Sequence, residues 1–86
     1  MNSSITKSFR ANFRQLPESV RKLAVKNYRL WKVDPRHPSL HFKSVGAYWS
    51  IRVGLSYRAL GRTKDGRLYW FWIGHHDVYD QMVRGL

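Results

Sequence analysis

Residues 57–73, YRALGRTKDGRLYWFWI, decide the fold of this 86-residue chain. Two strand-like runs flank Asp65-Gly66, a dipeptide that favours the two-residue turn of a β-hairpin. The second run, residues 68–73, is apolar on both faces, which is typical of a strand that is central or covered on both sides. The sequence therefore predicts an antiparallel hairpin whose second strand lies in the interior of a sheet.

Two further strands are predicted before this hairpin. Residues 40–43 and 49–53 alternate apolar with polar side chains, the pattern of a strand with one buried face. Turn signals lie at Gly46-Ala47 and at residues 54–56. Together the four strands form an antiparallel, four-stranded meander.

The turn lengths predict which side chains meet across the strands. A two-residue turn at 46–47 places Lys43 opposite Ser50 and His41 opposite Arg52, and a three-residue loop at 54–56 places Arg52 opposite Arg58. A two-residue turn at 65–66 then places Arg58 opposite Ile73. This register gives one apolar face, made of Leu40, Phe42, Trp49, Ile51, Val53, Ala59, Trp70 and Trp72.

The same register gathers His41, Lys43, Arg52 and Arg58 on the other face. Like charges directly opposite each other on a sheet are destabilising, so this arrangement favours a bound anion such as a phosphate. The simpler alternative is a solvated outer face whose cations only maintain solubility.

The first half of the chain is predicted to be helical. Residues 4–16 and 17–32 repeat apolar side chains at three- and four-residue spacing, and Pro17 separates the two segments. We expect them to form a helical hairpin on one face of the sheet, with a short C-terminal helix over residues 77–86. The fold class is α+β, in a single domain spanning residues 1–86.

Charge narrows the choice of partner. Sixteen Lys+Arg against five Asp+Glu give a net charge of +11, which favours nucleic acid first and an acidic protein second. The chain has no cysteine, which excludes disulfides and thiolate metal sites. It shows no run typical of a signal peptide or a membrane span, so we expect a cytoplasmic protein without membrane contact.

Residues 75–80, HHDVYD, form a titratable cluster after the apolar strand. Strand alternation favours His75 on the cationic face, although a turn at Gly74 leaves His76 open. Asp77 can orient an imidazole or serve as the N-cap of the last helix. No convincing third and fourth metal ligands lie at normal spacing, so we predict no metal or cofactor.

A cationic pocket with a histidine suits one reaction in particular. RNA is cut when its own 2′-hydroxyl attacks the adjacent phosphate, which requires a base, a proton donor for the 5′-oxygen and cations for the phosphorane. Arginine supplies paired donors that match phosphate oxygens. The same residues can equally hold a phosphate without cleaving it.

Three segments resemble the RelE/ParE family of bacterial toxins from type II toxin–antitoxin pairs: LPESVRKLAVKNYRLWKVDPRHPSLHFK (residues 16–43), WSIRVGLSYRALG (49–61) and WFWIGHHDVYD (70–80). The resemblance covers nearly the whole chain in order. It implies two N-terminal helices on a curved antiparallel sheet, and a metal-independent endoribonuclease that cleaves mRNA in the ribosomal A site. It also implies an antitoxin partner that covers the cationic surface.

The resemblance assigns roles residue by residue. Arg58 corresponds to the family's phosphate-binding arginine, Arg52 to a basic position of its nucleases, and Lys43 lies on the neighbouring strand. His76 stands where many members have arginine, and Tyr79 resembles their C-terminal tyrosine. Two departures weaken the match: the segment from His76 to Tyr79 is one residue shorter than the common form, and Ser50 replaces a basic residue.

The candidate catalytic residues are thus Arg58, His76, Arg52, His75 and Tyr79, and the candidate RNA- or phosphate-binding residues are Lys43, His41, Arg52 and Arg58. One alternative is a ParE-type inhibitor of DNA gyrase, but proton-transfer groups have no use in such an inhibitor. Another is a nucleic-acid-binding module without catalysis. No helix-turn-helix or zinc-finger pattern supports sequence-specific DNA binding.

Overall fold

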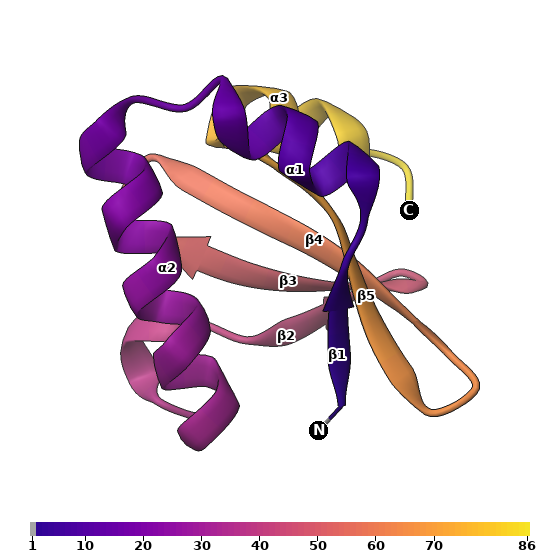
Figure 1. Ribbon diagram of the computed structural model, residues 1–86. Helices are drawn as coiled ribbons and strands as arrows, with labels where there is room; N and C mark the ends of the chain where they lie inside the picture. The colour runs from indigo at the N-terminus through magenta and orange to yellow at the C-terminus, as the bar shows by residue number, and fades with distance from the viewer. Residues whose placement is uncertain (1) are drawn as a thin grey trace.

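The computed structural model describes residues 2–86 and contains a mixed five-stranded sheet in the order β1-β5-β4-β3-β2 (Figure 1). The elements are β1 (Ser3–Ile5), α1 (Lys7–Arg14), α2 (Glu18–Val33), the 3-10 helix η1 (Pro38–Leu40), β2 (Lys43–Val45), β3 (Tyr48–Val53), β4 (Tyr57–Lys64), β5 (Arg67–His75) and α3 (His76–Val83). The α+β class is confirmed, whereas the prediction of four antiparallel strands is wrong by one strand. None of the helices in residues 2–86 is long and apolar enough to cross a membrane.

The additional strand is β1, which pairs in parallel with β5. Two of its residues, Ser4 and Ile5, were predicted to lie in the first turn of a helix, because Ile5 continues the apolar spacing of the helix that follows. The helix begins only at Lys7, since the side chain of Thr6 accepts a hydrogen bond from the Phe9 amide (3.2 Å) and caps it. The preceding residues are therefore free to extend along the open edge of β5, where the Thr6 amide donates to the Trp70 carbonyl (3.1 Å).

The two N-terminal helices do not form the predicted hairpin. Figure 1 shows α1 crossing the sheet at one end while α2 runs in a different direction beside it. Helix α1 packs mainly on β5, and α2 packs on β3. Both helices lie on the same side of the sheet, because residues of both line one apolar groove with the core-facing side chains Ile51 and Val53.

The first two predicted registers are confirmed. Lys43 pairs with Ser50 across a two-residue turn, and Arg52 pairs with Arg58 across the loop at 54–56. The strand β2 begins later than predicted, because Leu40 belongs to η1 and His41 adopts a left-handed conformation (φ 47°) that ends it. His41 is nevertheless beside Arg52, as the register predicted.

The third register changes partway along the hairpin. The Asp65-Gly66 turn is formed, with Lys64 opposite Arg67, but a bulge at Leu60/Gly61 leaves Phe71 as an extra residue of β5. The structure therefore places Arg58 opposite Gly74 rather than Ile73. Ile73 takes its place in the core, and the predicted core position of Trp72 is wrong.

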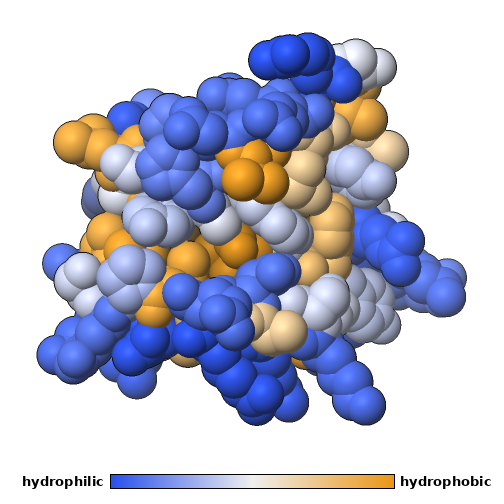
Figure 2. Space-filling model, turned by 90° about the horizontal axis from the view of Figure 1, so that it is seen from above, coloured by the Kyte–Doolittle hydropathy of each residue, from blue (hydrophilic) through white to orange (hydrophobic). Residues whose placement is uncertain are grey.

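The core lies between α1, α2 and the near face of the sheet. Its centre is Trp31 of α2, which is 1% exposed and has its ring edge-on to Phe42 (centroids 5.6 Å apart) and Trp70 (5.4 Å). Helix α3 packs against β4 and β5. The surface seen from the side of α1 and α3 is mostly hydrophilic, with hydrophobic atoms exposed between the polar side chains (Figure 2).

Candidate functional site: a cationic pocket and a histidine cluster

A pocket of about 280 Å³ lies on the face of the sheet opposite α1 and α2. It is lined by His41, Lys43, Ser50, Arg52, Arg58, Tyr79 and Asp80. These residues come from the segment before β2, from β2, β3 and β4, and from α3. The structure thus brings together all four residues predicted to bind phosphate, two of which, Arg52 and Arg58, are also predicted catalytic residues, and places a third predicted catalytic residue, Tyr79, beside them.

The two arginines of the pocket are fixed by the loop between β3 and β4. Arg52 Nε donates to the Gly54 carbonyl (3.2 Å), and Arg58 Nη1 donates to the carbonyls of Tyr57 (2.8 Å) and Leu55 (3.3 Å). These contacts to backbone carbonyls orient each guanidinium. They use only part of its donor capacity, because each guanidinium carries five N–H donors.

The pocket cations carry no compensating partners. Within residues 2–86, Lys43, Arg52 and Arg58 form no ion pair with a carboxylate. Arg52 and Arg58 also lie directly opposite each other on neighbouring strands, where like charges are unfavourable. An anion placed between them would offset that repulsion, and guanidinium groups offer paired donors to such an anion.

His41 is held as a proton acceptor. Its Nε2 lies 3.1 Å from Nη1 of Arg52, and because a guanidinium only donates, Nε2 is the acceptor and carries no proton. The neutral imidazole therefore has its proton on Nδ1. Arg52 occupies this lone pair, so His41 becomes able to take a proton from a hydroxyl only when the guanidinium turns to another acceptor, such as a bound anion.

Helix α3 closes one side of the pocket. The His76 amide donates to the Ser56 carbonyl (2.8 Å), which ties the start of the helix to the loop between β3 and β4. Tyr79, 8% exposed, and the exposed Asp80 then reach the pocket from the first turns of α3, while the buried Ser50 lies on β3. Within the pocket lining, Asp80 is the single carboxylate.

The two consecutive histidines do not line the pocket. The bulge in β5 reverses the alternation, so His75 pairs with Tyr57, which packs on the core side, and its ring lies edge-on to the tyrosine (5.5 Å). The prediction that strand alternation brings His75 to the cationic face is therefore wrong. His76 lies behind Asp80, with 3.6 Å between His76 Nδ1 and Asp80 Oδ2.

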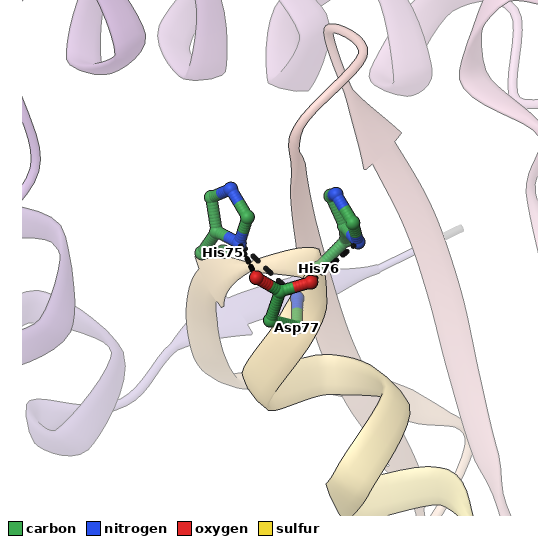
Figure 3. A group of neighbouring side chains, drawn as sticks. All are labelled: His75, His76 and Asp77. Atoms are coloured by element: carbon green, nitrogen blue, oxygen red, sulfur yellow. Dashed lines mark hydrogen bonds and ion pairs between the residues drawn. The ribbon is translucent and has the colours of Figure 1, made fainter.

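His75, His76 and Asp77 form a second cluster at the start of α3. Figure 3 shows the Asp77 carboxylate between the two imidazoles. Its Oδ2 is 3.4 Å from His75 Nδ1 and its Oδ1 is 3.3 Å from His76 Nδ1, and the two rings are stacked with centroids 4.5 Å apart. The N-cap of α3 is His75, whose Nδ1 accepts from the Asp77 amide (3.2 Å), so the alternative that Asp77 is the cap is wrong.

Ser50 and Asp80 line the pocket but were not selected as candidates from the sequence, and of the two only Asp80 carries a charge. The sequence spacing could have indicated Asp80, because His76 and Asp80 are four residues apart and therefore share one face of a helix. The predicted helix began one residue too late to contain both, which separated His76 from the residue that it contacts.

We expect Asp80→Asn to strengthen anion binding, since the carboxylate of Asp80 opposes a phosphate in the same pocket. A contribution of roughly 0.5–1 kcal/mol, or about two- to fivefold in affinity, is typical of one partly exposed charge. Fluorescence anisotropy of a short 2′-O-methyl RNA at low ionic strength measures it. Asp65→Asn is the matched control, because it removes the same charge in the turn between β4 and β5. Equal affinities of the two variants would contradict the placement of Asp80.

The architecture defines an α+β class with a mixed five-stranded sheet and helices on both faces. In sequence comparisons, no protein-family model and no curated protein matches the chain. Solved structures do share its fold, and those described next are toxins of toxin–antitoxin systems. The fold expected from the family resemblance is thereby confirmed: the chain has the fold of the RelE-like toxins.

Three of these structures illustrate the similarity. The RelB–RelE antitoxin–toxin complex of Methanococcus jannaschii matches with a TM-score of 0.69 at 20% identity, covering 90% of this chain and 95% of that one. The YoeB/ParE toxin of Agrobacterium tumefaciens matches at 0.66 and 18%, covering 88% and 99%. A mutant of the E. coli toxin RelE in the free state matches at 0.64 and 18%, covering 99% and 97%.

Proposed function

We propose that this chain is the toxin of a type II toxin–antitoxin pair and acts as a metal-independent endoribonuclease on mRNA, in the ribosomal A site. The observation that carries the proposal is the cationic pocket, in which Arg52 and Arg58 face each other without carboxylate partners beside an acceptor histidine, His41. A bound phosphodiester, with its single negative charge, would offset the repulsion between the two arginines, and the attached ribose would bring its 2′-hydroxyl next to His41.

The proposed reaction uses groups of the chain alone. The two arginines and Lys43 hold the scissile phosphate and stabilise the charge of the phosphorane. When Arg52 turns its Nη1 from His41 to the phosphate, His41 Nε2 is released and takes the proton of the 2′-hydroxyl, and O2′ bonds to phosphorus. The bond from phosphorus to O5′ breaks and O5′ receives a proton from Tyr79, which leaves a 2′,3′-cyclic phosphate and a 5′-hydroxyl.

The histidines outside the pocket have indirect roles in this proposal. His76 stays a candidate for proton transfer only through Asp80, whose carboxylate lies between it and the pocket. His75 fixes the start of α3 by capping it, and so positions Tyr79.

An antitoxin is the proposed protein partner. A groove of about 380 Å³ between α1, α2 and the sheet is lined mostly by apolar side chains such as Phe9 and Phe13, with Arg10, Arg29 and Lys32 among its basic residues. An acidic amphipathic segment fits this combination. The solved toxins of M. jannaschii and Mycobacterium tuberculosis are complexes with antitoxins, which supports such a partner. Because the proposed substrate is mRNA on the ribosome, the proposed site of action is the cytoplasm.

Primer extension on cellular mRNAs, minutes after a pulse of induced expression, tests this function. We expect new 5′ ends within translated regions, before growth stops. Intact mRNA together with broken DNA would instead indicate a gyrase inhibitor of the ParE type. Intact mRNA and DNA with normal growth would leave a non-catalytic binding protein.

A further inference from the structure

We propose that His75, His76 and Asp77 bind a divalent transition metal ion of the Zn²⁺ class, at a site separate from the cationic pocket. One ligand atom from each of these residues lies within 4.8 Å of the others. The sequence predicted no metal for lack of a third and a fourth ligand, and the turn from β5 into α3 supplies a third by placing Asp77 between the two imidazoles.

The Asp77 carboxylate is spaced from each imidazole nitrogen as two ligands are around a tetrahedral metal. Two ligands that are each ~2.0–2.1 Å from a tetrahedral Zn²⁺ are roughly 3.3–3.4 Å apart. The Asp77 oxygens are 3.4 Å from His75 Nδ1 and 3.3 Å from His76 Nδ1. Rotation about χ2, a torsion with a broad minimum, directs the lone pairs of both imidazoles at one ion, and His75 Nδ1 then exchanges the Asp77 amide hydrogen for the metal.

Without a cation, the contacts of the cluster conflict. His75 Nδ1 accepts the Asp77 amide hydrogen. An Asp77 carboxylate oxygen, which is also an acceptor, nevertheless lies 3.4 Å from the same nitrogen. His76 Nδ1 has carboxylate oxygens of Asp77 and Asp80 at 3.3 and 3.6 Å, and a single proton on Nδ1 serves only one of them. A metal ion between these atoms satisfies several of them at once.

The acidic residues around the cluster also favour a cation, although the net charge of the whole chain is +11. Two of the five acidic residues of the chain, Asp77 and Asp80, lie in the first turns of α3, where they offset the positive end of the helix. The ligand set of two imidazoles and one carboxylate selects among metals. It suits Zn²⁺ and its neighbours, whereas Mg²⁺ prefers oxygen ligands and water.

The test uses the full chain without a polyhistidine tag and without RNA, so its result does not depend on the proposed nuclease function. Titration with Co²⁺ is followed by visible absorption, and Zn²⁺ is then added in competition. We expect saturable Co²⁺ binding with the spectrum of a tetrahedral site, displacement by Zn²⁺, and no competition from Mg²⁺. Absence of saturable binding to the wild-type chain would overturn the proposal.

Variants identify the ligands. His76→Ala and Asp77→Asn should each weaken Co²⁺ binding by about tenfold or more, the scale of losing a metal-site partner. His37→Ala is the matched control for the histidines, because His37 also caps a short helix by accepting an amide hydrogen through Nδ1 (3.2 Å) but lies outside the cluster. Circular dichroism verifies that each variant is folded. Equal affinity of the wild type and both ligand variants would also refute the site.

Discussion

Arg58→Ala is expected to lower the rate of RNA cleavage by about 10²–10³-fold, because removal of one donor to the charge of a transition state typically has that effect. The side chain lines the pocket, faces Arg52 directly and has its Nη1 fixed by two backbone carbonyls. In the proposed mechanism, these contacts orient its guanidinium before substrate binds. Toxicity on induced expression should disappear with the cleavage.

The fold should survive this substitution. Arg58 is partly exposed, and its loss removes two hydrogen bonds but also the repulsion from Arg52, so the free energy of unfolding should change by less than about 1 kcal/mol. Arg62→Ala is the matched control, since Arg62 is an exposed arginine of the same strand outside the pocket. Primer extension and denaturant unfolding measure the two effects. A folded Arg58→Ala protein that cuts mRNA at the wild-type rate would exclude Arg58 from the site.

The sheet was predictable where turn chemistry determines it. Gly46-Ala47, the loop at 54–56 and Asp65-Gly66 are short turns with defined lengths, so they set the pairing of the strands that they connect. The cationic face followed from the first two of these registers, because alternation along a strand then places Lys43, Arg52 and Arg58 together.

The bulge was not predictable from the apolar pattern. Residues 70–72 are Trp, Phe and Trp, so a shift of one residue replaces one aromatic side chain by another and the pattern barely changes. Gly61 was the available signal, because glycine within a strand often marks a bulge. The consequence was large, since the shift turned His75 away from the pocket and left Gly74 opposite Arg58.

The strand β1 and the cluster around Asp77 depend on contacts between distant residues. Three residues, Ser-Ser-Ile, carry no strand periodicity of their own, and they become a strand only because β5 offers an open edge. The cluster depends on where α3 begins, and His75 caps that helix in place of the Asp77 that cap preferences favour. Local propensity does not determine either outcome.

Trp31→Ala is expected to lower the free energy of unfolding by about 3–5 kcal/mol, the range for removing a large aromatic side chain from a core. Trp31 is 1% exposed, and its ring contacts those of Tyr28, Phe42 and Trp70. Its Nε1 is buried without a hydrogen-bond partner within residues 2–86, so the loss is one of packing alone. A chain of this length has a total stability of roughly 4–13 kcal/mol, so the variant should lose from about a quarter to all of that stability.

Denaturant unfolding followed by circular dichroism measures this loss, with Val33→Ala as the control two residues further along α2. Val33 is 85% exposed, and its replacement should change the stability by no more than about 0.5 kcal/mol. Trp31 lies on the core side of the sheet, away from the pocket. Any loss of RNA cleavage in Trp31→Ala should therefore follow the folded fraction, whereas Arg58→Ala should lose cleavage while folded. A Trp31→Ala protein as stable as Val33→Ala would contradict the central position of Trp31, because such a cavity cannot form in a packed core without cost.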